Sequence, residues 1–344
     1  MHTETALPRP PMATWRRVAG YGVAIAMAPY LLLKIAWTLG LILPAAHLGE
    51  AGWRMTNAAT AVLAAAAIVL SMACCRPWGE KLPAPLVALP LWVGTGLLIP
   101  ALLLAPVLGP AAMARDRDRA AGAAGIWAWE QVLVMVSLVG AGIGLPLCLA
   151  GYARARWPEA LGGPLGHPGL PGNTRQLQVT LAGVAAAGCL LLGVAKVYWS
   201  VGGTLGIDPA LPAARDLWWH LISFSTGAWA LAGAWGVLAL ATHRGSHRFL
   251  PPMAAAWLCS GILFAQNVFD ALSATRTDAR PSPELPVARV LSGEAGITVG
   301  VLMGVVVLLV LHDRRRAWAA RGSATTGARH TLGLHPLSEE SEWP

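Results

Sequence analysis

Long apolar runs recur along the whole chain of 344 residues, and they restrict its fold more than any other feature. The runs lie at 18–43, 57–75, 85–108, 123–151, 176–201, 218–242, 252–272 and 290–311. Each has about 20 residues or more, enough for a helix to cross a hydrocarbon core of roughly 30 Å. The sequence therefore predicts an all-α, polytopic membrane protein with eight transmembrane helices.

The charge content excludes an ordinary soluble domain. Only 12% of the residues are charged, whereas soluble domains have about 25% and need them for a polar shell. The net charge of +8 does not indicate nucleic-acid binding, because the basic residues are scattered among short loops. More of them fall on the side of the N-terminus, so the positive-inside rule predicts that both termini lie in the cytoplasm. The richness in Ala, Gly, Leu, Arg and Pro, with very little Lys, indicates a GC-rich bacterial genome and hence a bacterial cytoplasmic membrane.

A motif of lysine, tryptophan and glycine at three-residue intervals occurs twice. It reads Lys34-Ile-Ala-Trp37-Thr-Leu-Gly40 and Lys196-Val-Tyr-Trp199-Ser-Val-Gly202, at an offset of 162 residues. The same offset places the second, third and fourth apolar runs on the sixth, seventh and eighth. We therefore expect two tandem four-helix repeats. Each has an even number of spans, so the repeats share one orientation and an axis along the membrane normal relates them.

This pattern divides the chain into five segments. We expect a disordered cytoplasmic N-terminus at 1–17, a first membrane repeat at 18–156, a cytoplasmic linker at 157–175, a second repeat at 176–316 and a disordered cytoplasmic tail at 317–344. The tail is basic, then rich in Gly, Ser and Thr, then acidic, which is a composition typical of disorder.

Ionisable residues inside the predicted spans fall at one level in the outer half of the bilayer. They are Lys34, Glu130, Lys196, Asp270 and Glu294. A lone charge in hydrocarbon costs about 2.5–3.5 kcal/mol, so such residues normally face the bundle interior and pair. The expected pairs are Lys34 with Glu130 and Lys196 with Glu294. They are either structural links between helices or part of a binding or proton-handling site.

The second repeat is the more polar at this level and is the expected location of a binding site. Its candidate binding or ion-pair residues are Lys196, Tyr198, Trp199, His220, Asn267, Asp270 and Glu294. Lys34 and Glu130 are the corresponding ion pair of the first repeat, which we call the scaffold copy because its surroundings are expected to be structural. His220 has a second interpretation as an interfacial residue in an aromatic belt. Trp37 and Trp199 either stack on the lysines or anchor their helices at the interface.

Catalytic and metal-binding motifs are missing from the sequence. There is no Walker loop, no Gly-x-Ser-x-Gly elbow, no His-Glu-x-x-His and no Cys-x-x-Cys pair. The cysteines, Cys74, Cys75, Cys148, Cys189 and Cys259, lie in or at the ends of apolar runs and are expected to be buried packing residues. We expect no metal and no cofactor. A redox or metal role for Cys74, Cys75 and Cys148 is the alternative.

The stretch Lys196-Val-Tyr198-Trp199-Ser-Val-Gly202-Gly203 resembles a Tyr-Trp-x-x-Gly-Gly signature in uncharacterised actinobacterial membrane proteins built of small four-helix units. The resemblance covers these eight residues and the helix count. The first copy departs from it, with Ala36 in place of the tyrosine and Leu41 in place of the second glycine. It implies an actinobacterial cytoplasmic membrane and brings no specific activity.

We expect a non-enzymatic protein, surrounded by the lipid bilayer, that binds or moves a small solute or a proton through the outer polar layer. The ligand is expected to be a small molecule or a lipid. One alternative is a membrane-embedded enzyme for a lipid-linked or quinone-like substrate, with His220 and either Asp270 or Glu294 as acid–base groups. Another is a structural or partner-binding subunit, in which the charges only join helices. The sequence favours no particular oligomeric state.

Overall fold

The computed structural model describes residues 14–42, 51–120, 128–165, 174–244, 246–273 and 282–331. Within these ranges the regular structure is helical, apart from two isolated β-bridges. The helices are α1 (Thr14–Leu39), α2 (Ala51–Cys75), α3 (Ala84–Ala120), α4 (Ala128–Arg156), α5 (Pro158–Leu161), α6 (Arg175–Ser200), α7 (Leu217–Thr242), α8 (Leu250–Ser273) and α9 (Pro286–Thr331), with short 3-10 turns at Pro77–Lys81 and Pro212–Ala214.

Eight of these helices, all except α5, are long and apolar enough to cross a membrane. The prediction of an all-helical chain with eight candidate spans is therefore confirmed. The bounds differ from the apolar runs at several ends: α1 begins at Thr14 and α9 continues to Thr331. The segment after the last span is rich in Ala and Arg, which favour helix and let it continue beyond the apolar part. Residues 1–13 and 332–344 lie outside the described ranges.

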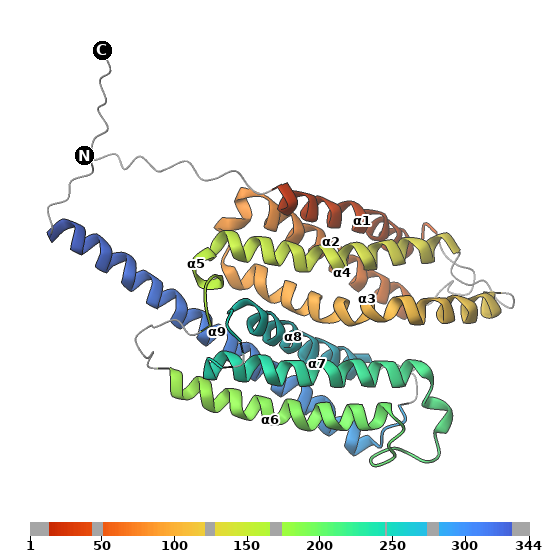
Figure 1. Cartoon of the computed structure of the whole chain (residues 1–344). Helices are drawn as coiled ribbons and strands as arrows, with labels where there is room; N and C mark the ends of the chain where they lie inside the picture. The colour runs from red at the N-terminus through yellow and green to blue at the C-terminus, as the bar shows by residue number, and fades with distance from the viewer. Residues whose placement is uncertain are drawn as a thin grey trace.

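The spanning helices form two groups of four, α1–α4 and α6–α9 (Figure 1). In each group the first helix packs against the second and the fourth, and the third helix packs against the fourth. Each group also has its own apolar core, with Leu91 and Leu145 in the first and Leu263 and Met303 in the second. Each half of the chain therefore buries its own apolar stripe.

The two groups meet mainly where α3 packs against α8 (Figure 1). The Trp92 indole N–H donates to the Ser260 hydroxyl at 2.9 Å, and its ring stacks on Phe264 with centroids 4.9 Å apart. The backbones approach closely at Gly96 and Gly261, where a Cβ on Gly96 would lie 2.2 Å from the Gly261 carbonyl oxygen. Small residues let membrane helices pack at short range in this way.

Two buried arginines close the end of the bundle at which α1 begins and α4 and α7 end, here named the arginine-rich end. Arg16 donates to the Cys74 carbonyl and forms an ion pair with Glu80 at 3.1 Å. In the other half, Arg314 donates to the Gly162 carbonyl at 2.6 Å. Both guanidinium groups satisfy carbonyl oxygens that a helix end or a turn leaves unpaired. The cysteines are buried free thiols, as expected of packing residues.

The close approach of α3 and α8 leads to a first prediction. We expect Gly96→Ala to lower the stability by about 1–3 kcal/mol, because the added methyl group meets backbone that cannot move aside easily. The thermal unfolding midpoint of the detergent-purified protein measures this effect.

Gly183→Ala is the matched control, because nothing lies within 4 Å of a Cβ at this helical glycine. Alanine is the better helix former by about 0.5–1 kcal/mol, so this variant should be neutral or slightly stabilised. Equal midpoints for the two variants would contradict the assigned interface.

Candidate functional site at the Lys196 end of the bundle

The end opposite the arginine-rich end, here named the Lys196 end, contains the second copy of the repeated motif. Helix α6 ends at Ser200, and Gly202 adopts φ +104°, in the left-handed region that favours glycine. The Gly202 N–H donates to the Trp199 carbonyl at 3.1 Å, and the Gly203 N–H donates to the Tyr198 carbonyl at 2.9 Å. This pattern resembles the glycine helix stop named after Schellman. It ends α6 directly after the motif.

The first copy ends α1 with the same bonds. Gly40 has φ +76° and donates to the Trp37 carbonyl at 3.2 Å, and the Leu41 N–H donates to the Ala36 carbonyl at 2.9 Å. The glycines therefore stop both helices. Leucine at position 41 can replace the second glycine of the motif because only the residue before it, Gly40, has a positive φ.

Lys196 lies in a network of five residues, which we call the Lys196 network: Lys196, Trp199, Trp219, Ser282 and Glu284. The lysine Nζ is 3.6 Å from Glu284 Oε1 and 4.9 Å from the centre of the Trp199 ring. The Trp219 indole N–H donates to Oε1 of the same carboxylate at 3.0 Å, and the Ser282 hydroxyl donates to Oε2. Trp199 is 6% exposed, so it stacks on the lysine inside the bundle instead of anchoring α6 at the interface.

The predicted pairing of Lys196 with Glu294 is wrong. The carboxylate beside Lys196 is Glu284, which precedes α9, whereas Glu294 is exposed further along that helix and forms no ion pair with any described residue. A β-bridge between Ile207 and Glu284 holds the carboxylate over α6. Sequence analysis missed Glu284 because it lies outside the apolar run. Its one signal is that it directly precedes the last span.

Burial and the surrounding donors act in opposite directions on Glu284, whose side chain is 8% exposed. Burial favours the neutral acid. The charge of Lys196 and the hydrogen bonds from Ser282 and Trp219 outweigh burial and lower the pKa of the carboxyl below its usual 4.5. The native structure therefore holds an ionised carboxylate here.

Tyr198 and His220 organise the chain that follows α6. The Tyr198 hydroxyl accepts from the backbone N–H groups of Thr204 and Leu205, at 3.2 and 3.3 Å. His220 Nδ1 is 2.9 Å from the Ser200 carbonyl oxygen, so it is the donor and carries a proton. Both side chains stabilise the loop between α6 and α7, and His220 also satisfies a carbonyl at the end of α6.

The amides of α8 join helices. Asn267 donates to the Leu263 carbonyl of its own helix at 2.6 Å and packs on Gly296, where a Cβ would lie 2.2 Å from its nitrogen. Gln266, which the sequence interpretation did not include, donates to the Gly96 and Leu97 carbonyls of α3 at 3.3 and 3.2 Å. These two residues therefore act in packing within the second half and between the halves.

Asp270 differs from the other candidates because it is an exposed residue of a candidate membrane-spanning helix and also lies beside the charges of Lys196 and Arg289. It interacts electrostatically with Lys196 and Arg289, and with the negative charge of Glu284. None of the hydrogen bonds assigned within the described ranges uses its side chain. Asp270 is therefore the accessible acceptor beside a network whose other groups are engaged.

Lys34 of the scaffold copy contacts an amide, whereas Lys196 contacts a carboxylate. Lys34 Nζ donates to Asn57 Oδ1 at 2.7 Å and lies 4.4 Å from the centre of the Trp37 ring. Trp37 is 2% exposed and, like Trp199, stacks inside the bundle. The side chain of Glu130 lies outside the described residues, so its predicted pairing with Lys34 is not tested. Asn57 was missed because an amide carries no charge to mark it as a partner.

The site holds one carboxylate in a saturated network and a second, accessible carboxylate one helix away. The described residues contain no group of three or more His, Cys, Asp or Glu that could hold a metal ion. No protein-family model, curated protein or solved structure matches the chain. Inference about function therefore depends on the geometry of the site.

The Lys196 network leads to a prediction about acid stability. A carboxyl with a lowered pKa in the folded state contributes stability at a pH above its ordinary value, and this contribution is lost as the pH falls through the folded-state pKa. We therefore expect Glu284→Gln to lower the stability by about 1–3 kcal/mol at neutral pH. We also expect it to weaken the decrease in the thermal midpoint that the unchanged protein shows below pH 4.5.

Glu294→Gln makes the same chemical change at an exposed site and serves as the control. It should leave both the neutral-pH midpoint and the acid dependence unchanged. A Glu294 variant that is affected as strongly as the Glu284 variant would contradict the assignment of the lysine's partner.

Proposed function

We propose that this chain is an integral membrane protein that binds or translocates a small polar solute or a proton at the Lys196 end of its second half. One observation carries the proposal: Asp270, an exposed residue of a candidate membrane-spanning helix, lies beside the charges of Lys196 and Arg289. Ionisable residues inside membrane spans are costly and are functional candidates by default. A proton or a cationic group on a small solute is the chemistry that an accessible carboxylate accepts.

The Lys196 network supports this proposal as a fixed wall of the site. Lys196, the Trp219 indole N–H and the Ser282 hydroxyl are directed at Glu284, and the first two contacts hold the ends of α6 and α7 against the segment before α9. A ligand at Asp270 would meet charges whose positions are already fixed. Such preorganisation lowers the entropy cost of binding.

We infer that the two halves arose by duplication and share one orientation. The α3–α8 contact supports this inference: Trp92 lies beside Trp257, with centroids 6.4 Å apart, and Gly96 lies against Gly261. The members of each pair are 165 residues apart in the chain, so they are equivalent if the second half has three more residues before this point than the motif offset of 162 gives. Equivalent residues meet one another only next to a two-fold axis, here an axis along the membrane normal. We also propose that both termini lie in the cytoplasm and that the membrane is the cytoplasmic membrane of an actinobacterium.

A structural or partner-binding role is the second candidate, and the saturation of the Lys196 network favours it. The contacts of Glu284 with Lys196 of α6 and with Trp219 of α7 fasten the ends of these two helices to the segment before α9. The enzymatic alternative has less support, because no hydrogen bond among the described residues joins His220 to Asp270 or Glu294. His220 instead donates to a backbone carbonyl.

The Asp270→Asn variant tests the proposed function. We expect the purified protein to be stabilised by at least one member of a panel of small amines, amino acids and polyamines, or to carry protons in liposomes that contain a pH-sensitive dye. Asp270→Asn should reduce either response about tenfold or more, because the amide cannot accept a proton at neutral pH. Glu294→Gln, which also removes an exposed carboxylate of the second half, is the control.

The double variant Lys196→Met/Glu284→Met separates the two candidate functions. Replacing both members of a buried ion pair with apolar residues of similar size is often tolerated. A stable double variant that retains the Asp270-dependent response would identify the network as a support for the site. If the unchanged protein shows no response that depends on Asp270, the structural role is the better account.

A further inference from the structure

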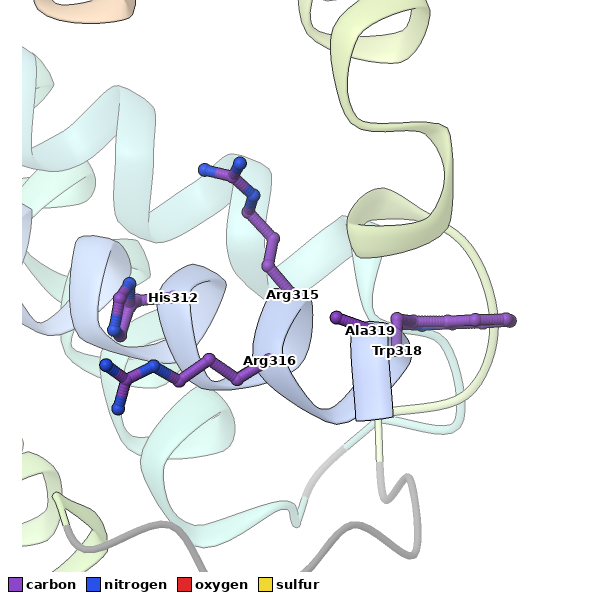
Figure 2. Close-up of a pocket in the computed structure, with 5 residues that line it drawn as sticks. All are labelled: His312, Arg315, Arg316, Trp318 and Ala319. Atoms are coloured by element: carbon purple, nitrogen blue, oxygen red, sulfur yellow. The ribbon is translucent and has the colours of Figure 1, made fainter. Parts of the chain in front are cut away.

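A pocket of about 510 Å³ lies at the arginine-rich end, away from the site at Asp270. Its described lining comes from a single segment of α9: His312, Arg315, Arg316, Trp318 and Ala319. Figure 2 shows the His312 and Arg316 side chains extending to the same side of the helix. We propose that this pocket binds the phosphate headgroup of an anionic phospholipid, a role independent of the proposed function.

The pocket is positively charged because neither of its arginines is paired with a carboxylate of the described residues. In the same helical turn, Asp313 accepts from Thr174 at 2.6 Å and Arg314 is buried, so these two residues serve the fold. Arg315 and Arg316 are exposed, and no carboxylate of the described residues forms an ion pair with either. A guanidinium group matches the oxygens of a phosphate with two parallel hydrogen bonds. A phosphate group therefore matches the charge and the donor geometry of the pocket.

One of these arginines is already held in place. The Arg315 guanidinium lies 5.6 Å from the centre of the Trp157 ring, which follows directly after α4. A stacked guanidinium keeps its N–H groups free at the ring edge. The pocket therefore lies where the first half of the chain meets α9. A ligand bound there would contact the Arg315 guanidinium, which belongs to α9 and is held by Trp157.

The position of the pocket along α9 matches the level of lipid phosphates. The apolar stretch at 290–311 is about 33 Å long at 1.5 Å per residue, which slightly exceeds a hydrocarbon core of roughly 30 Å. The pocket residues begin directly after this stretch, at His312. Arginine and tryptophan at this level are typical of the membrane–water interface. Basic pockets beside membrane helices bind anionic headgroups.

An exposed apolar face on the same side of α9 provides a place for the acyl chains. Val301, Val305 and Leu308 are 43%, 38% and 56% exposed. They precede His312 and Arg316 at intervals of three or four residues, the spacing of one helical face. A phospholipid matches both the apolar face and the charged pocket, whereas inorganic phosphate matches only the pocket. A second copy packed face to face would place arginine against arginine.

Native mass spectrometry of the detergent-purified protein tests this proposal. Phosphatidylglycerol and phosphatidylcholine with identical acyl chains are titrated against the full-length chain, with and without millimolar inorganic phosphate. We expect phosphatidylglycerol to bind about tenfold or more tightly than phosphatidylcholine, and Arg315→Gln/Arg316→Gln to weaken its binding about 10- to 30-fold. Phosphate at this concentration should not displace the lipid.

Arg17→Gln/Arg244→Gln is the control, because it removes the same charge from two exposed arginines at the same end. It should change the affinity for phosphatidylglycerol less than threefold. Thermal midpoints of both double variants check that each is folded. The proposal is overturned if the Arg315/Arg316 variant binds phosphatidylglycerol as the unchanged protein does, or if the control loses as much affinity. It is also overturned if phosphatidylcholine binds equally well, or if phosphate displaces the lipid, which would indicate a free-anion site.

Discussion

The lack of hydrogen-bonding partners in a hydrocarbon environment is the constraint on which the rest of this structure depends. It requires each backbone group to pair within its own helix, and it requires the few polar side chains to find partners on neighbouring helices. Several buried polar side chains among the described residues follow that requirement. Trp92 pairs with Ser260, Lys34 pairs with Asn57, and the side chain of Glu284 accepts from two hydroxyl or indole donors beside Lys196.

This requirement also explains the division of roles among the candidate residues. Tyr198, His220 and Asn267 are directed at backbone groups, so their polarity is used to end helices or hold them together. Asp270 is left as the accessible group beside the Lys196 network. A pattern of polar residues at one membrane level therefore contains both structural and candidate functional groups, and hydrogen-bond partners separate them.

The two ends of the bundle present different chemistry. At the arginine-rich end, buried arginines bind backbone carbonyls, whereas the exposed arginines of α9 line an open pocket. At the Lys196 end, cations and carboxylates occur together and mostly compensate one another. This asymmetry agrees with the expected excess of basic residues on one side of a membrane. It also places the two proposed ligands at opposite ends of the same half of the chain.

The sequence by itself determined the candidate spans and the C-terminal ends of α1 and α6. Apolar length sets the number of candidate spans, and the glycine of the repeated motif, in a left-handed conformation, stops α1 and α6. Both effects are local, because they do not depend on which helices pack against one another. The partner of Lys196 was decided only by the tertiary structure, because Glu284 reaches it through a bridge to Ile207. Helical periodicity describes one helix at a time. It could not show that this loop carboxylate, and not Glu294 within the span, lies over the lysine.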